Sequence, residues 1–276
     1  MNLKYITITS LKDDRLGSQM NNFAMLFLIA QKTGHTVGIL NNHLSLGTGQ
    51  KLITETFNAP VEFIEDSAVN NMSLLYWDTT SNINLPKQEN IFELDSNSNY
   101  NVCAGLIHFN FLYFLNKQNL DHLKQNIFRF HQQIQEESQQ YFNTIKIHNK
   151  KILSVHVRRT DHCTLSPEYQ KQAIKLFDSE EYKVLMLSDD IEFCKNEFRE
   201  CLVDYEVVYS NNSSAVDMHL MTLCDVNITA DSTFSLWGAL LNEADNEMII
   251  PRSLLPTNMN ISEILMHVKK FRALNW

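Results

Sequence analysis

A short run of β-forming residues, Ile152-Leu153-Ser154-Val155-His156-Val157, decides the fold class when it is read with the segments that follow it. The run has the length and apolar content of a buried strand. The chain then alternates between predicted helices and strands, at 168–177, 183–187, 191–198, 206–209, 216–224, 226–229, 233–241 and 247–250. Repeated strand–helix units of this length predict a parallel, doubly wound sheet.

The first half of the chain opens with a similar unit. A predicted strand at 5–9 and a polar loop at 11–17 lead into a helix at 19–33. Gly34 follows this helix at the position where a left-handed C-cap residue is common, and a strand resumes at 36–40. This arrangement is one βαβ unit, so the fold class is α/β in both halves.

Further elements are predicted around these two regions. Strands are expected at 61–65, 91–94 and 102–109, where Asn- and Ser-rich turns separate apolar runs. A polar helical stretch from 120 to 148 leads into the alternating half, and an amphipathic helix is predicted at 261–271. We therefore expect two domains, residues 1–147 and 148–276.

The composition restricts the kind of ligand. Hydrophobic residues make up 44% and charged residues 20%, as in ordinary globular proteins. The net charge is −9, whereas nucleic-acid-binding proteins usually carry a basic face, because phosphate contacts supply most of their affinity. We expect no nucleic-acid partner, but a small phosphorylated ligand remains possible because it needs only a few fixed positive charges.

Cysteine spacing and hydropathy bear on location. The five cysteines form neither a C-x-x-C pair nor a zinc pattern, which indicates reduced thiols. The first ten residues lack the charged and apolar regions of a signal peptide, and the most apolar helical segment is too short to span a bilayer. We expect a cytoplasmic protein with at most peripheral membrane contact.

Polar side chains gather where the predicted strands of the second half end. The four clusters lie at 158–162, 188–190, 211–217 and 230–235. Ligands of open parallel sheets bind outside the carboxyl ends of the strands, so these clusters predict one binding rim.

Two adjacent arginines, Arg158 and Arg159, give this rim its chemistry. An arginine is always charged, and its planar donors fit phosphate oxygens in pairs. A diphosphate leaving group needs such a counter-charge, because negative charge builds on it as the bond breaks. The alternative is that one arginine pairs with Asp161 and braces the turn, and both can hold at once.

The motif Ser154-Val155-His156-Val157-Arg158-Arg159-Thr160-Asp161 resembles the donor-site motif of the α1,2-, α1,6- and protein O-fucosyltransferase superfamily. Later blocks resemble those of the bacterial α1,2-fucosyltransferases (glycosyltransferase family 11) in the same order, and they are Leu187-Ser188-Asp189-Asp190, Asp217-Met218-His219-Leu220-Met221 and the run from Ala230 to Ala239. Leu16-Gly17-Ser18-Gln19-Met20 is similar to a loop in the family's first domain. The resemblance implies a GT-B-like fold of two facing Rossmann-like domains, with the acceptor side in 1–147 and the GDP-sugar site in 148–276.

The resemblance also implies roles for individual residues. Arg158 and Arg159 would bind the β-phosphate side of GDP, and His156 and Asp217 would read the guanine. Ser188, Asp189 and Asp190 would lie at the ribose or the nearby backbone. Phosphate would meet the start of a helix, at Ser232, Thr233, Phe234 and Ser235. Gly17, Ser18 and Gln19 would complete the donor site, with the acceptor near 17–22.

Each assignment has a structural alternative. Asp217 or Ser232 could simply cap a helix, and Asp189-Asp190 could be a solvated turn. Several positions also depart from the family pattern, namely Ser18, Asn21, Asp231 and Leu236. These departures leave the acceptor and the linkage less defined than the donor.

Catalysis is expected to need no metal ion. The chain has no Asp-x-Asp triplet of the kind that coordinates Mn²⁺ or Mg²⁺ against a diphosphate, so the arginines would take over that role. A base must accept the proton of the acceptor hydroxyl. We assign Asp161 to this role, with Asp14, Glu168 and His162 as the other candidates.

The sequence therefore predicts an inverting, metal-independent enzyme that moves L-fucose from GDP-fucose to a glycan hydroxyl, galactose 2-OH in an α1,2 linkage. Its acceptor would be a galactose-containing oligosaccharide, such as a lipid-linked O-antigen glycan at the inner face of a bacterial plasma membrane. The alternatives are another GDP-sugar, another linkage, or a non-catalytic protein that binds nucleotide sugars or glycans. An NAD-dependent oxidoreductase is the rival from another enzyme class and is disfavoured, because the loop after the first strand lacks a G-x-G-x-x-G pattern.

Overall fold

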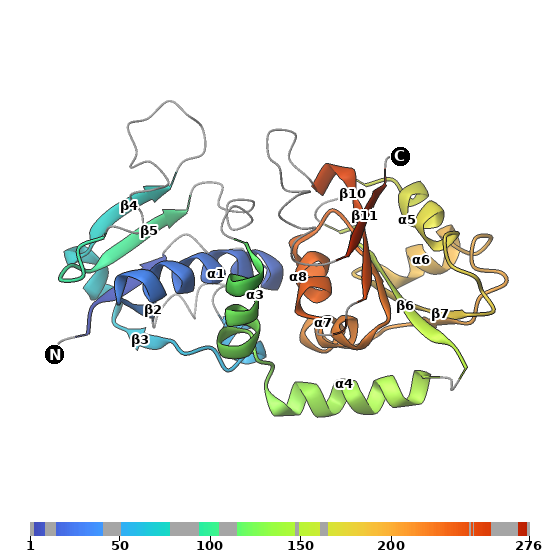
Figure 1. The fold of residues 1–276 in the computed structure, drawn as a ribbon, viewed down its shortest axis with the longest axis horizontal. Helices are drawn as coiled ribbons and strands as arrows, with labels where there is room; N and C mark the ends of the chain where they lie inside the picture. The colour runs from blue at the N-terminus through green and yellow to red at the C-terminus, as the bar shows by residue number, and fades with distance from the viewer. Residues whose placement is uncertain are drawn as a thin grey trace. The chain divides into compact units, whose positions relative to one another are not determined.

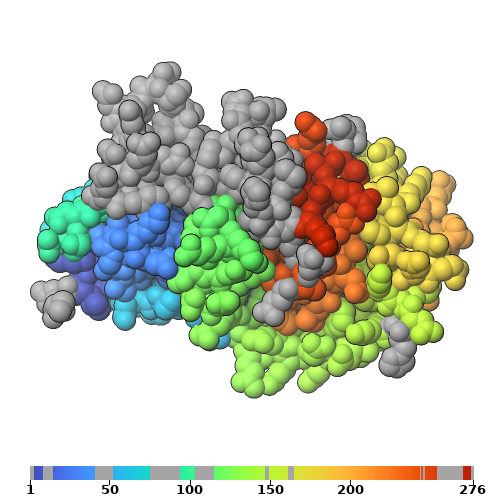
Figure 2. All heavy atoms as spheres, viewed as in Figure 1, coloured from blue at the N-terminus to red at the C-terminus, as the bar shows by residue number. Residues whose placement is uncertain are grey.

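The computed structural model describes residues 3–8, 15–40, 51–77, 94–104, 115–146, 149–160, 165–242, 244, 246–254 and 270–274. The chain divides into two compact units, Met1–His131 and Gln132–Trp276, and each unit contains one parallel sheet (Figure 1). The division falls before the expected boundary at 147/148, because helix α4 (Gln132–Ile145) packs on α7 (Ser214–Leu223) of the second unit. Figure 2 shows α4, in yellow-green, at the surface of that unit.

The first unit is a five-stranded sheet with the order β3-β2-β1-β5-β4, and all of its paired strands are parallel. Its elements are β1 (Tyr5–Ile8), α1 (Leu16–Thr33), β2 (Thr36–Leu40), α2 (Lys51–Thr56), β3 (Glu62–Ile64), η2 (Asp66–Asn71), β4 (Ser73–Trp77), β5 (Tyr100–Ala104), α3 (Lys117–His122) and η5 (Leu123–Ile127). Helix α1 is buried over most of its length. It ends at Gly34, which has a φ of 76° and donates its N–H to the Ala30 carbonyl, as predicted.

The second unit is a six-stranded parallel sheet with the order β11-β10-β9-β6-β7-β8. Its strands are β6 (Lys151–Val157), β7 (Tyr182–Ser188), β8 (Val207–Tyr209), β9 (Val226–Ile228), β10 (Glu247–Pro251) and β11 (Phe271–Leu274). Besides α4 and α7, its helices are α5 (Pro167–Ile174), α6 (Ile191–Glu197), α8 (Thr233–Leu241) and η6 (Arg252–Leu254). Helices α5 and α6 cover one face of the sheet, whereas α4 and α7 cover the other.

The predicted α/β class with parallel sheets is confirmed, and several element boundaries are corrected. Helix α1 begins at Leu16, so Gly17 and Ser18 lie in its first turn and not in a loop. The polar stretch at 120–148 is not one helix, because η5 ends at Ile127 and α4 starts at Gln132. Strands β4 and β11 were not predicted, and β11 takes in Phe271, the end of the helix expected at 261–271. The rest of that helix lies outside the described residues.

Helices α7 and α8 approach closely at Gly238. A Cβ atom at this position would lie 2.7 Å from Met221 Sδ and 3.0 Å from Met221 Cβ. We therefore expect Gly238→Ala to lower the free energy of unfolding by about 1–3 kcal/mol, the usual range for overpacking a core. Urea denaturation measures this loss. Met221→Ala serves as the partner in a double-mutant cycle, and additive losses for the two changes would contradict the contact.

Candidate functional site

The candidate site lies at the carboxyl end of β6, in the middle of the second sheet. From β6 the chain builds outward through β7 and β8, then crosses to β9 on the other side of β6 and continues to β10 and β11. The loops after β6 and β9 therefore leave in opposite directions, and such a switch point is where doubly wound sheets bind their ligands. Three of the predicted clusters follow β6, β7 and β9 directly at this edge.

Asp189, just beyond β7, holds the turn that carries the two arginines. Its carboxylate accepts the backbone N–H groups of Arg159, at 2.8 Å, and Thr160, at 3.2 Å, and the Thr160 hydroxyl at 2.7 Å. The Arg158 Nε atom lies 3.5 Å from the same carboxylate. Burial alone would raise the pKa of Asp189, but these hydrogen bonds and the Arg158 charge outweigh it and lower the pKa. The carboxylate is thus ionised and braces the arginine turn. Whether an arginine also pairs with Asp161, the alternative weighed from the sequence, concerns a residue outside the described ranges.

The two arginines have different surroundings. Arg158 pairs with Asp189, whereas the Arg159 guanidinium lies over the ring of Phe193, with Cζ 3.9 Å from the ring centroid. Within the described part of the chain, no carboxylate pairs with the Arg159 guanidinium. Arg159 is therefore a cation that is held by an aromatic ring and that no described carboxylate neutralises.

His156 is the second-last residue of β6, and its side chain lies on the face of the sheet that α8 covers. Its ring centroid lies 5.2 Å from that of Phe234 in the first turn of α8. Burial, helped by the Arg158 charge, lowers the pKa of His156 to about 4, so the ring is neutral at pH 7. Its Nδ1 atom is buried and has no hydrogen-bond partner among the described residues. A buried polar atom without a partner is costly, and a ligand could satisfy it.

Asp217 lies in the first turn of α7 but does not cap that helix. Ser213 is the N-cap residue, and its hydroxyl accepts the Val216 N–H. The Asp217 carboxylate instead accepts a hydrogen bond from the Ser210 hydroxyl. Burial raises the pKa of Asp217 to about 7, although hydrogen bonds from Ser210 and Asn212 partly oppose the rise. The capping alternative is therefore wrong, and Asp217 is a carboxyl that is easily protonated.

The N-terminus of α8 consists of partly exposed residues. Ser232 is at the N-cap position, but its side chain makes no capping hydrogen bond. The Ser235 hydroxyl is taken up within the turn, because it accepts the Ala230 N–H and donates to the Ser232 carbonyl. Ser232, Thr233 and Phe234 are each partly exposed, and a helix N-terminus favours anions. Ser235 thus shapes the turn between β9 and the first turn of α8.

The predicted residues of the β7 turn divide into two kinds. Asp190 caps α6, because its carboxylate accepts the Phe193 N–H at 2.9 Å. Ser188 accepts the Asp190 N–H at 3.0 Å. These two residues therefore shape the turn, and Asp189 alone of the three reaches the arginine loop.

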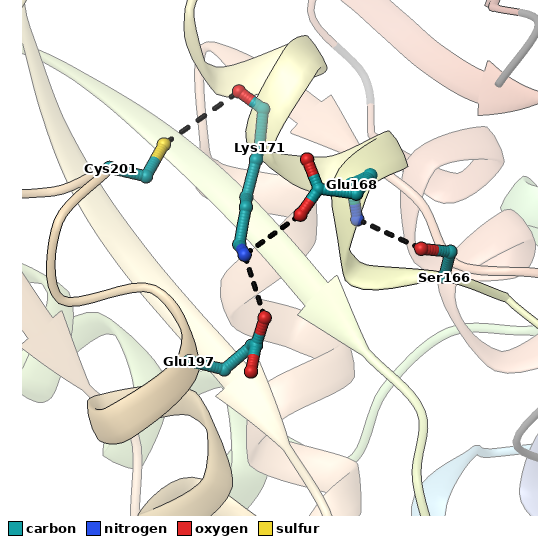
Figure 3. Close-up of polar contacts among 5 residues, drawn as sticks. All are labelled: Ser166, Glu168, Lys171, Glu197 and Cys201. Carbon is teal, nitrogen blue, oxygen red and sulfur yellow. Dashed lines mark hydrogen bonds and ion pairs between the residues drawn. The ribbon is translucent and has the colours of Figure 1, made fainter.

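The remaining predicted residues lie in the first unit, in α5, or outside the described residues. Gly17, Ser18 and Gln19 form the first turn of α1 in the other unit, and their part in the donor site stays a prediction. Among the candidate bases, Glu168 forms an ion pair with Lys171, at 2.9 Å (Figure 3). Asp161, Asp14 and His162 lie outside the described residues.

Two residues that contact the site were missed by sequence reasoning. They are Phe193 and Ser210, whereas Asn212 falls in the cluster predicted at 211–217. A phenylalanine at helical spacing gives no sign that an arginine lies over its ring. No group of three or more His, Cys, Asp or Glu residues suited to a metal ion occurs among the described residues.

The comparisons with solved structures concern the fold. Fucosyltransferase NodZ from Bradyrhizobium superposes with a TM-score of 0.58 at 19% identity, over 87% of this chain and 93% of NodZ. FUT1 of Arabidopsis thaliana superposes with a TM-score of 0.59 at 15% identity, over 94% of this chain and 72% of FUT1. These similarities show a GT-B-like fold.

Two relatives from Escherichia coli are similar in sequence. The O-antigen biosynthesis glycosyltransferase WbnK is 34% identical over 157 residues, which are 49% of this chain and 51% of WbnK. An alpha-1,2-colitosyltransferase is 34% identical over 109 residues, which are 34% of this chain and 37% of that relative. The chain thus matches about half the length of WbnK and less of the second relative.

The family comparison covers nearly the whole chain. The profile of the family described as Glycosyl transferase family 11 matches residues 4–266. This range includes the first turn of α1, the arginine turn and the α8 block, which are the motifs that carried the predicted resemblance. The chain therefore belongs to glycosyl transferase family 11.

Proposed function

We propose that this glycosyltransferase binds GDP-fucose at the edge formed by the β6, β7, β8 and β9 loops, and transfers L-fucose to a glycan hydroxyl. The single observation that supports this most is the arginine turn held by Asp189. It presents two cations after β6, and α8, whose N-cap side chain makes no capping hydrogen bond, starts after the neighbouring strand β9 at the switch point of the sheet. Both features favour a diphosphate.

The choice of guanine rests on Asp217 and His156. Guanine presents two adjacent donors, N1–H and N2–H, which suit a carboxylate. Asp217 is a partly buried carboxylate with few fixed partners, and neutral His156 has an unpaired buried Nδ1 among the described residues. NodZ was crystallised with GDP and soaked with GDP-fucose, which is consistent with the same nucleotide here.

The proposed reaction is inverting and needs no metal ion. As the bond between the sugar C1 and the β-phosphate oxygen breaks, negative charge grows on the diphosphate, and Arg158 and Arg159 stabilise it. The acceptor oxygen attacks C1 from the opposite face and loses its proton, for which Asp161 is our proposed base. Gly17, Ser18 and Gln19 are proposed as further donor-binding residues.

The acceptor is proposed to be a galactose-containing oligosaccharide that receives fucose at the 2-OH. WbnK is named for O-antigen biosynthesis, which fits a lipid-linked glycan as acceptor and a cytoplasmic enzyme that meets the membrane at its inner face. Among the described residues, no helix is both long and apolar enough to cross a membrane. The α1,2 linkage is the expected one, although NodZ is an α1,6-enzyme.

A second candidate differs in the sugar. One relative is named as an alpha-1,2-colitosyltransferase, so a deoxysugar other than fucose on GDP is the main alternative. Parallel turnover assays with GDP-fucose and other GDP-deoxysugars distinguish the two, since the phosphate and guanine contacts are common to both.

Nucleotide binding is the first test of the proposal. GDP at 100 times its dissociation constant should raise the free energy of unfolding by about 2.7 kcal/mol, by mass action on the native state. Thermal melts with GDP, UDP and NAD measure the shift, and turnover with lactose-type acceptors with and without EDTA tests catalysis and metal dependence. A shift of the melting temperature with UDP or NAD and none with GDP would contradict the assignment of a guanine nucleotide. GDP binding without turnover over a broad acceptor panel would favour a non-catalytic binding protein.

A further inference from the structure

Arg159 is held against an aromatic ring. Its guanidinium Cζ lies 3.9 Å from the centroid of the Phe193 ring, well within the distance of a cation–π contact. A ring that covers the flat face of a guanidinium leaves the N–H groups along its edge unused. Among the described residues no carboxylate competes for those N–H groups. Arg158, in contrast, gives its Nε side to Asp189.

Phe193 itself is fixed at the start of α6. Its N–H donates to Asp190 Oδ1 at 2.9 Å, which is the N-cap bond of the helix. Its ring packs against the hydrophobic cluster under α5 and α6. The backbone and the side chain of Phe193 are thus both anchored.

The far end of α6 is tied to α5. The Lys171 ammonium donates to Glu197 Oε1 at 2.6 Å and to Glu168 Oε1 at 2.9 Å, so one lysine connects the two helices (Figure 3). Helix α6 is therefore supported at both ends, and the ring of Phe193 is a fixed surface for Arg159.

We propose that Phe193 is a positioning residue for the donor: its ring holds the Arg159 guanidinium flat, with its edge directed to the diphosphate. This inference rests on the proposed function, because it needs a diphosphate ligand. Asp189 fixes the backbone of the turn, and Phe193 fixes the side chain. A flexible arginine would lose rotamer freedom on binding, and the ring removes that cost beforehand.

The test compares Phe193→Leu with Phe193→Tyr. Leucine keeps an apolar side chain but removes the ring, so we expect GDP affinity and kcat/KM to fall by about 3- to 30-fold, the range that cation–π energies predict. Tyrosine keeps the ring and should stay within about twofold of the wild type. Isothermal titration with GDP and steady-state kinetics give the values, and thermal melts verify that both variants fold.

A double-mutant cycle separates positioning from a general packing effect. If Phe193 acts through Arg159, then Phe193→Leu should have no further effect on GDP affinity in an Arg159→Gln background. Additive losses in the cycle, or a loss in Phe193→Tyr as large as in Phe193→Leu, would overturn the inference while wild-type GDP binding stands. If the wild-type protein does not bind GDP, the proposed function and this inference both fail.

Discussion

Replacing either arginine of the turn should stop transfer without unfolding the protein. Arg158→Gln and Arg159→Gln are each expected to lower kcat by about 10²- to 10³-fold, the usual loss when one preorganised donor to a developing charge is removed. The physical reason is that glutamine retains polarity and much of the side-chain length but carries no charge to offset the departing diphosphate. GDP release from GDP-fucose, measured at saturating acceptor, gives kcat, and thermal melts report folding.

Arg199→Gln is the matched control for this experiment. Arg199 is exposed beyond the last residue of α6, away from the strand ends, so its replacement removes the same charge without touching the turn. It should leave kcat unchanged, because surface charges far from a site are screened. Near-wild-type kcat in both Arg158→Gln and Arg159→Gln would overturn the donor-site assignment. An equal loss of kcat in Arg199→Gln would show that the loss in the turn variants is an effect of net charge.

The strands of the second sheet could be predicted from the sequence because they are apolar runs that end in polar clusters. Each strand from β6 to β10 was located to within a residue or so at either end, and the shared edge followed from the parallel arrangement. Strand β11 was missed because Phe271–Leu274 follows a segment with helical periodicity, and the pairing with β10 that makes it a strand is visible only in three dimensions.

The site was only partly predictable for a related reason. Residue types identified Arg158, Arg159 and Asp217 as chemically apt, but not their partners. Three serines, at 210, 213 and 214, precede Asp217, and only the structure shows that Ser213 caps α7 while Ser210 binds the carboxylate. The helix start at Leu16 was likewise misjudged, because Gly17 and Ser18 are weak helix formers that packing of α1 in the core overrides.

Binding of GDP should depend on pH through Asp217. In the free protein burial raises the pKa of this carboxyl to about 7, whereas guanine donors require the ionised form. Affinity should therefore fall as the pH drops below about 7, by up to tenfold per pH unit, and level off above it. Titration calorimetry from pH 5.5 to 8.5 measures the profile.

Asp217→Asn is the variant that isolates this effect. An asparagine cannot ionise and offers only one acceptor, so GDP affinity at pH 8 should fall by about 10- to 100-fold, the value of hydrogen bonds to a charged group. The β-phosphate of GDP also titrates near pH 6, but it does so equally in both proteins. The ratio of the two affinities at each pH therefore reports Asp217 alone, and a ratio that is constant from pH 5.5 to 8.5 would contradict the guanine contact.

In the ligand-free protein, Asp217 should make the free energy of unfolding fall as the pH rises, the opposite of its effect on GDP affinity. Its pKa is raised in the folded state above the unfolded value of 3.8, so the folded protein binds more protons between about pH 4 and 7. Asp217 thus contributes most to the free energy of unfolding when it is protonated, and this contribution is lost as the pH rises from about 4 to 7. Asp217→Asn should not show that loss. We therefore expect GDP affinity to rise with pH while the free energy of unfolding of the ligand-free protein falls. If Asp217→Asn removes both dependences, then the buried carboxyl of Asp217 is the group that contacts guanine.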